Sequence, residues 1–292
     1  ESTLFETSIC VTGQHKEMLD QVLEIFDIKP DFNLSVMKDN QDLYDITSSI
    51  LLGIRQRLAE FKPDLVLIHG DTTTTLATSM ACFYSDIPIG HVEAGLRTNN
   101  IKAPFPEEFN RRVATLTTKL HFAPTELSQK NLLEEGVEGS KIFVTGNTVI
   151  DALQLALSSI ENDQCKRDDI YNSLTRLLKF DLTKEKYILI TGHRRENFGK
   201  GFENICSALY EIASQYPELK IVYPVHLNPN VQDPVNKMLR KHSNIHLIEP
   251  QDYEPFIILL KHCFFVLTDS GGIQEEAPSL GKPVLVMRDV TE

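Results

Sequence analysis

The most constraining feature of this sequence is a repeated order of short β-branched runs, each followed by a turn and an amphipathic stretch of about ten to fifteen residues. This order predicts parallel β-sheets covered by helices, because parallel strands need long crossover connections. In the first half the expected strands are 65–69, 87–92, 120–123 and 141–144, and the expected helices are 73–84, 107–118 and 126–135, the last ended by Gly136.

The same order resumes at Tyr187, after a polar stretch at 158–186 that carries many charges and no strand pattern. The second half then has expected strands at 187–191, 220–224, 245–248, 264–268 and 283–287, and expected helices at 202–215 and 253–262. We therefore expect two doubly wound domains, residues 1–150 and residues 151–292, with the linker at the start of the second. The absence of a short internal repeat argues against solenoids and propellers.

The charge balance excludes a broad class of partners. A formal net charge of -12 argues against nucleic acids and anionic membranes, because general phosphate binding needs an excess of Lys and Arg. The five cysteines are scattered and form no C-x-x-C pair, so neither a disulfide framework nor a zinc site is indicated. No apolar run reaches the roughly 18–20 residues that cross a bilayer, and no signal-peptide pattern opens the sequence, which favours a cytoplasmic protein.

Three carboxylates stand where the first expected domain would bind a ligand. Asp71 and Glu93 directly follow expected strands, and Glu107 opens an expected helix behind two prolines. Ligands of open α/β sheets bind beyond the carboxyl ends of the strands, so we expect all three carboxylates at one rim. Each has an ordinary alternative: Asp71 could cap a helix, Glu93 could pair with Arg97, and Glu107 could complement a helix dipole.

Two loops of the second half suit an anionic ligand. The turn at 192–197 presents one His and two Arg beside a glycine, and such cations can stabilise a departing diphosphate, although a solvated basic turn is the alternative. The Ser-Gly-Gly turn at 270–272 would expose N–H groups at a helix N-terminus, and Glu276 further along could accept ribose hydroxyls. Neither G-x-G-x-x-G nor a Walker loop is present, which argues against dinucleotide dehydrogenases and P-loop ATPases.

Taken together, these motifs resemble the bacterial non-hydrolysing UDP-N-acetylglucosamine 2-epimerases. The shared segments run through almost the whole chain: 11–15, 69–71, 91–98, 106–108 with Asn110 and Arg111, 145–148, 192–197, 269–272 and 274–276. The resemblance implies an α/β fold of the GT-B type, in which two Rossmann-like, doubly wound domains face each other across a cleft. It also implies a homodimer that needs neither a redox cofactor nor a metal.

The family interconverts UDP-GlcNAc and UDP-ManNAc by anti elimination of UDP to 2-acetamidoglucal and re-addition, and its product feeds bacterial surface polysaccharides. The resemblance implies acid, base or cation-stabilising roles for Asp71, Glu93 and Glu107, and assistance of diphosphate departure by His193. The nucleotide-binding residues that it implies are Gln251 and Phe256 at the base, Ser270, Gly271 and Gly272 at the phosphates, and Glu276 at the ribose. Phe256 equally suits the core of its own helix.

Members of the family also bind a second, activating UDP-GlcNAc, and Gln14, Arg194 and His226 match positions of that site. The family's first strand with its phosphate loop, and its C-terminal helix, are expected to lie outside the sequence given. Two alternatives are a GT-B glycosyltransferase, which would need an acceptor, and an inactive protein that binds sugar nucleotides. The first-domain carboxylates together with the 192–197 motif favour the epimerase.

Overall fold

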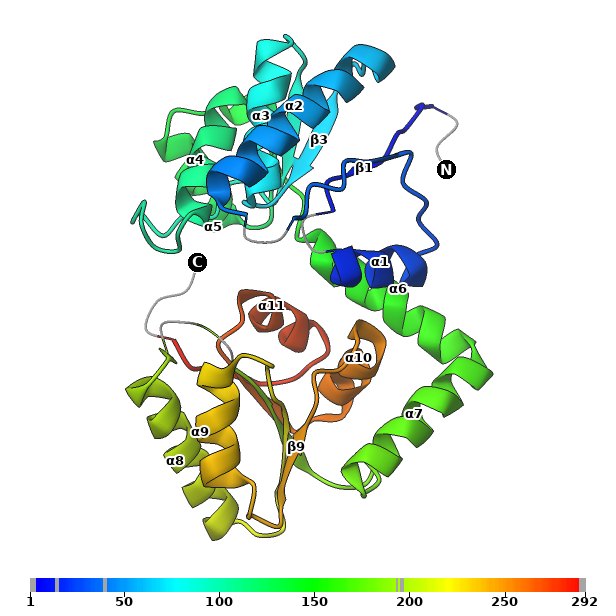
Figure 1. The fold of residues 1–292 in the computed structure, drawn as a ribbon, viewed down its shortest axis with the longest axis vertical. Coiled ribbons are helices and arrows are strands. Elements are labelled where there is room, and N and C mark those ends of the chain that lie inside the picture. The colour runs from blue at the N-terminus through cyan, green and yellow to red at the C-terminus, as the bar shows by residue number, and fades with distance from the viewer. Residues whose placement is uncertain (1–3, 14–15, 39–40, 193, 195–196, 289–292) are drawn as a thin grey trace. The chain divides into compact units, whose positions relative to one another are not determined.

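The computed structural model describes residues 4–13, 16–38, 41–192, 194 and 197–288. The chain forms two compact units that divide between Thr148 and Val149, and each unit contains an extended parallel β-sheet (Figure 1). Within the described residues, no helix is both long enough and apolar enough to cross a membrane. None of the five cysteines forms a disulfide.

The larger sheet of the first unit has four parallel strands in the order β3, β4, β5, β6. These strands are Val66–His69, Ile89–Val92, Leu120–Ala123 and Ile142–Val144. Because each strand pairs with the next one in the sequence, all four carboxyl ends lie at the same edge of the sheet. All four strands were predicted from the alternation, although three of them start one or two residues later than expected.

Helices α2, α3 and α4 pack side by side and share the main hydrophobic core of this unit (Figure 1). Their residues are Leu43–Phe61, Thr73–Tyr84 and Glu107–Thr117. A second core cluster of Ala94, Ala123, Leu132 and Ile142 lies under α5, Glu126–Glu134. Helix α1, Lys16–Ile25, and the paired strands β1, Cys10–Val11, and β2, Phe32–Asn33, precede these elements.

The sheet of the second unit has five parallel strands in the order β11, β10, β7, β8, β9. These strands are Val284–Val286, Phe265–Thr268, Tyr187–Thr191, Lys220–Pro224 and Ile245–Ile248. The chain runs from β7 outward to β9 and then returns to place β10 on the other side of β7. The crossover direction therefore reverses between β7 and β10, which is the point at which doubly wound sheets bind ligands.

Within the described residues, six helices cover the two faces of this sheet. They are α6, Thr148–Asn162; α7, Gln164–Leu178; α8, Lys200–Gln215; α9, Pro229–Leu239; α10, Tyr253–His262; and α11, Gly271–Ser279. The stretch at 158–186, expected to be a polar linker, instead contains the end of α6 and the whole of α7. Its charges are solvated, while Ile170, Leu174 and Leu178, spaced four residues apart, bury one face of the helix.

Candidate active site

The turn after β3 holds Asp71 through contacts from three other elements. Three successive carbonyl oxygens, those of His69, Gly70 and Asp71, each accept a hydrogen bond from a side chain. The donors are Thr75 Oγ1 of α3 at 2.6 Å, His91 Nε2 of β4 at 2.7 Å and Asn110 Nδ2 of α4 at 2.8 Å. Buried carbonyl groups are costly unless they are paired, so these contacts fix the backbone of the turn.

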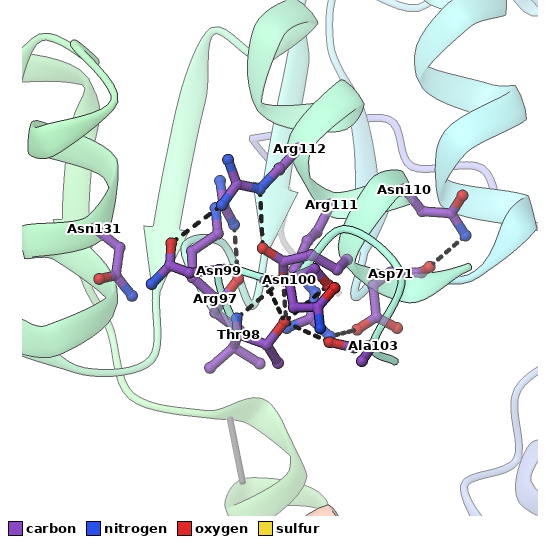
Figure 2. Close-up of polar contacts among 12 residues, drawn as sticks. Asp71, Arg97, Thr98, Asn99, Asn100, Ala103, Asn110, Arg111, Arg112 and Asn131 are labelled. Atoms are coloured by element: carbon purple, nitrogen blue, oxygen red, sulfur yellow. Dashed lines mark hydrogen bonds and ion pairs between the residues drawn. The ribbon is translucent and has the colours of Figure 1, made fainter. Parts of the chain in front are cut away.

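The carboxylate of Asp71 is paired with Arg111 of α4. Arg111 Nη2 lies 2.6 Å from Asp71 Oδ2, and the arginine side chain is almost fully buried while that of Asp71 is 27% exposed (Figure 2). Glu108, one helical turn before Arg111, is fully buried and accepts from Arg112 Nε at 2.9 Å and from the backbone N–H of Thr98 at 3.1 Å. Asp71 is therefore not the N-cap of α3, a position that Thr72 holds, and its carboxylate belongs to an ionic network.

Glu93 lies next to Asp71, on the turn that follows β4. A Cβ atom added to Gly70 would lie 3.1 Å from Glu93 Oε2, so the missing side chain of Gly70 makes room for this carboxylate. Glu93 also accepts a hydrogen bond from Asn147 Nδ2 at 3.3 Å. Its backbone has φ +66°, a conformation that costs energy in any residue with a side chain and that is concentrated at functional sites.

Arg97 does not have the partner that the sequence suggested. Its Nε and Nη2 donate to the two carboxylate oxygens of Glu135, each at 2.7 Å, and Nη2 also donates to Thr115 Oγ1 at 2.8 Å. The side chain of Arg97 is buried, and the pair joins the loop after β4 to the end of α5. The alternative in which Glu93 pairs with Arg97 is therefore wrong, because packing brings Glu135 to the guanidinium.

Glu107 and Glu108 open α4 together but have different surroundings. Glu108 is completely buried within the ionic network. Glu107 is half-buried, and its Oε2 is inaccessible to water without a hydrogen-bond partner among the described residues. A buried carboxylate oxygen without a partner is costly, and such costs are found mainly where the group serves a function.

Burial lowers the pKa values of two histidines of this rim. Burial lowers the pKa of His91 to about 4, and burial likewise lowers the pKa of His69 despite the neighbouring Asp71 carboxylate. Neutral His91 donates through Nε2 to the carbonyl oxygen of Gly70, so it supports the turn that carries Asp71. Among the described residues there is no cluster of three or more side chains that could bind a metal.

Gly95, in the loop after β4, occupies a position that only glycine can adopt without strain. Gly95 has φ +91°, and an added Cβ atom would lie 2.3 Å from the carbonyl oxygen of Ser128. We expect Gly95→Ala to lower the free energy of unfolding by roughly 3 kcal/mol, through backbone strain and a steric clash. The control is Gly136→Ala, where φ is +86° and the added atom meets nothing within 4 Å, so roughly 1 kcal/mol of strain alone remains. Urea unfolding of both variants would measure the difference, and equal losses would contradict the clash.

In the second unit, two loops meet at the point where the strand order reverses. The fully buried carboxylate of Asp269, after β10, accepts from the backbone N–H of Arg194 at 2.9 Å and from Asn197 Nδ2 at 3.2 Å, both in the loop after β7. Tyr223 of β8 donates to the carbonyl oxygen of Gly192 at 3.1 Å in the same loop. His193, to which the resemblance gives a role in diphosphate departure, lies outside the described residues.

Helix α11 begins at Gly271, inside the expected Ser-Gly-Gly turn, with Ser270 as its N-cap. Gly272 is exposed, and an added Cβ atom would meet nothing within 4 Å. The first N–H groups of a helix have no partner within the helix, so they can bind an anion. Glu276 follows on the same helix and is 7% exposed. Burial, and then the charge of Glu275, raise the pKa of Glu276 to about 7, while Glu276 helps to raise the pKa of Tyr253 to about 12.

The remaining residues suggested by the sequence have varied surroundings. Gln251 donates through Nε2 to the carbonyl oxygen of Glu249 at 2.8 Å in the loop before α10, and half-buried Phe256 of α10 packs against the core. His226 is exposed after β8. Gln14 lies outside the described residues. Sequence reasoning gave no role to Asn110, Arg111, Asn147 or Asp269, although all four stand in the motifs that carry the resemblance.

Parallel α/β sheets in both units, with polar loops at the carboxyl ends of their strands, are the architecture of GT-B enzymes that act on nucleotide sugars. The model of the family described as UDP-N-acetylglucosamine 2-epimerase matches residues 1–292. The chain belongs to this family of isomerases, which decides against the glycosyltransferase alternative.

Individual relatives support this assignment. A UDP-N-acetylglucosamine 2-epimerase of Yersinia pestis is 58% identical over 288 residues, which are 99% of this chain and 76% of the relative. The crystal structure of the Neisseria meningitidis UDP-GlcNAc 2-epimerase bound to UDP-GlcNAc has a TM-score of 0.92 and 50% identity, over 99% of this chain and 77% of that one. A Staphylococcus aureus protein solved with UDP has a TM-score of 0.84 and 44% identity, over 99% and 73% of the two chains.

Proposed function

We propose that this protein inverts C2 of UDP-GlcNAc to give UDP-ManNAc, by elimination of UDP followed by its re-addition. In the first stage a base removes the proton from C2, the bond between C1 and the diphosphate oxygen breaks, and 2-acetamidoglucal and UDP form. In the second stage the diphosphate oxygen returns to C1 and a proton is delivered to the opposite face of C2. Atoms and charges balance without a redox step, so no cofactor is required.

The carboxylates of the first unit are what this reaction needs. The C2 hydrogen is not acidic and the departing diphosphate leaves C1 with positive charge, so carboxylates that stabilise a cation and carry protons lower both barriers. Asp71, Glu93 and Glu107 are our candidates for these roles. The observation that carries the proposal is the closeness of Glu93 to the Asp71 turn, together with the buried oxygen of Glu107 that has no hydrogen-bond partner in the described part of the chain.

The nucleotide would bind to the second unit. The N–H groups at the start of α11, with Ser270, Gly271 and Gly272, suit the diphosphate, and the Glu276 carboxylate suits the ribose hydroxyls. Gln251 and Phe256 would lie at the base, while His193 would assist the departing diphosphate. The relatives from Neisseria meningitidis and Staphylococcus aureus, solved with UDP-GlcNAc and with UDP, support this class of ligand.

Deuterium exchange tests the proposal directly. The full-length protein would be incubated with UDP-GlcNAc in deuterium oxide, and C2 would be followed by NMR. We expect deuterium at C2 together with the appearance of UDP-ManNAc. Epimerisation without exchange would overturn the elimination route, and sugar transfer that depends on an added acceptor would overturn the proposed function.

Glu276 predicts a pH dependence of UDP binding. Only the carboxylate accepts both ribose hydroxyls, and its pKa is about 7, so we expect the Kd for UDP to rise by about tenfold from pH 8 to pH 6. Glu276→Gln should remove this component and leave only the titration of UDP itself, as measured by calorimetry. The free energy of unfolding should change with pH in the opposite direction. Because the pKa of Glu276 is raised in the folded protein, protonated Glu276 stabilises the fold, and this stabilisation is lost as the pH rises through about 7.

Four further properties belong to the proposal: activation, assembly, location and the use of the product. A second UDP-GlcNAc bound near Gln14, Arg194 and His226 would activate the enzyme, and conversion of UDP-ManNAc that needs no added UDP-GlcNAc would exclude this. A homodimer would cover the exposed Phe83, Tyr84 and Leu116 of α3 and α4. The cytoplasm suits five cysteines that form no disulfide, and the product would supply surface polysaccharide synthesis.

A further inference from the structure

Helix α4 carries a buried cation, Arg111, that forms an ion pair with one of the candidate catalytic carboxylates. The side chain of Arg111 is 3% exposed, and Nη2 lies 2.6 Å from Asp71 Oδ2. Asp71 Oδ1 makes no hydrogen bond to any of the described residues, and the Asp71 side chain is 27% exposed. One oxygen of this carboxylate is thus held by the protein while the other remains available at the rim.

Glu108 fixes the arginine in turn. Its Oε2 lies 3.7 Å from Arg111 Nη1 and accepts from the backbone N–H of Thr98, and its Oε1 accepts from Arg112 Nε. A free arginine side chain has about 2 kcal/mol of rotamer entropy, so a fixed counter-ion is what makes a long side chain a precise donor. Figure 2 shows Arg111 and Arg112 of α4 beside Thr98 of the loop after β4.

We infer that Arg111, held by Glu108, is a positioning residue that orients Asp71 for the reaction at C1 and C2. This inference rests on the proposed function. Arg111 acts through Asp71: its fork holds Oδ2, while Asn110 holds the main-chain carbonyl oxygen of the same residue at 2.8 Å. The side chain and the backbone of Asp71 are therefore both held by the second turn of α4, which leaves Oδ1 as the carboxylate oxygen available to act on the substrate.

The test compares Arg111→Met with Arg97→Met in the full-length protein. Arg97 is a matched control, because its side chain is also buried and forms an ion pair, with Glu135, but it has no hydrogen bond to Asp71. We expect Arg111→Met to lower kcat by about 100-fold while KM and the Kd for UDP change by less than about threefold, since a displaced catalytic group loses turnover before binding. Arg97→Met should lower the melting temperature but keep kcat within about threefold.

A double-mutant cycle separates positioning from general stability. If Arg111 acts through Asp71, then Arg111→Met should cause no further loss of kcat in an Asp71→Asn background. Should Arg111→Met fail to fold, Arg111→Lys and Arg97→Lys replace the pair. Lys keeps the charge but loses the planar fork, so Arg111→Lys should lower kcat at least about tenfold while Arg97→Lys stays within about threefold.

The outcomes distinguish this inference from the function on which it rests. A wild-type protein that does not epimerise UDP-GlcNAc overturns the proposed function. Suppose instead that the wild type epimerises UDP-GlcNAc. If the kcat of the Arg111 variant then stays within threefold of the wild type, or falls no further than the kcat of the Arg97 control, only the role of Arg111 is overturned. Losses from Asp71→Asn and Arg111→Met that multiply in the double variant would also overturn it.

Discussion

Glu107→Gln is expected to lower kcat by between about 100-fold and 10,000-fold while the stability of the fold hardly changes. Gln has the same shape but neither carries a negative charge nor exchanges a proton. Glu107 Oε2 is buried without a hydrogen-bond partner among the described residues, so removing the charge breaks no hydrogen bond between this oxygen and those residues. The reaction, by contrast, loses a group that can stabilise the cation at C1 or carry the C2 proton.

The measurement is kcat and KM for full-length wild type and variant, together with urea unfolding of both. We expect the free energies of unfolding to agree within about 0.5 kcal/mol. Deuterium exchange at C2 should fall in step with kcat, because both depend on the same proton transfer. A variant with wild-type turnover would remove Glu107 from the catalytic groups.

Glu108→Gln, one position further along, should instead lower the stability of the fold strongly. The carboxylate of Glu108 is fully buried between Arg111 and Arg112, and a neutral amide would leave two cations without their shared counter-ion. Removing one partner of a buried ion pair usually costs about 3–5 kcal/mol, most of it from the uncompensated charge that remains. We expect a loss near the lower end, about 3 kcal/mol, because Arg112 is 36% exposed and can be hydrated.

Urea unfolding of Glu108→Gln would be compared with that of Glu134→Gln. Glu134 pairs with Lys130 at 3.7 Å on α5, but both side chains are about two-thirds exposed. Its replacement should change the unfolding free energy by less than about 1 kcal/mol, as is usual for solvent-exposed pairs. If the two variants lost equal stability, the buried network around Glu108 would have no special energetic role.

The fold could be predicted closely where apolar periodicity is local. The alternation predicted β5, β7, β8, β9, α3 and α10 with the bounds that the structure shows. Helix α7 was missed because its many charges obscured a single buried row of residues spaced four apart. Whether such a row is buried depends on the sheet on which it packs, and no local pattern contains that information.

The site could be predicted in part, for a similar reason. The rule that ligands bind beyond the carboxyl ends of strands selected Asp71 and Glu93 without any knowledge of contacts. The same rule could not find Arg111, which lies 40 residues from Asp71 in the sequence, or pair Arg97 with Glu135 rather than with Glu93. Long side chains reach several partners, and only the packed helix decides which partner is near.

The two acids that open α4 show most clearly what the sequence determined and what the tertiary structure decided. By itself the sequence determined that two parallel α/β sheets form, that polar residues follow their strands, and that Glu107 and Glu108 begin a helix there. It did not determine which acid is buried in an ion network and which keeps an unpartnered oxygen. Neighbouring residues on a helix point about 100° apart, so the tertiary packing of α4 against the β3 and β4 turns decided their roles.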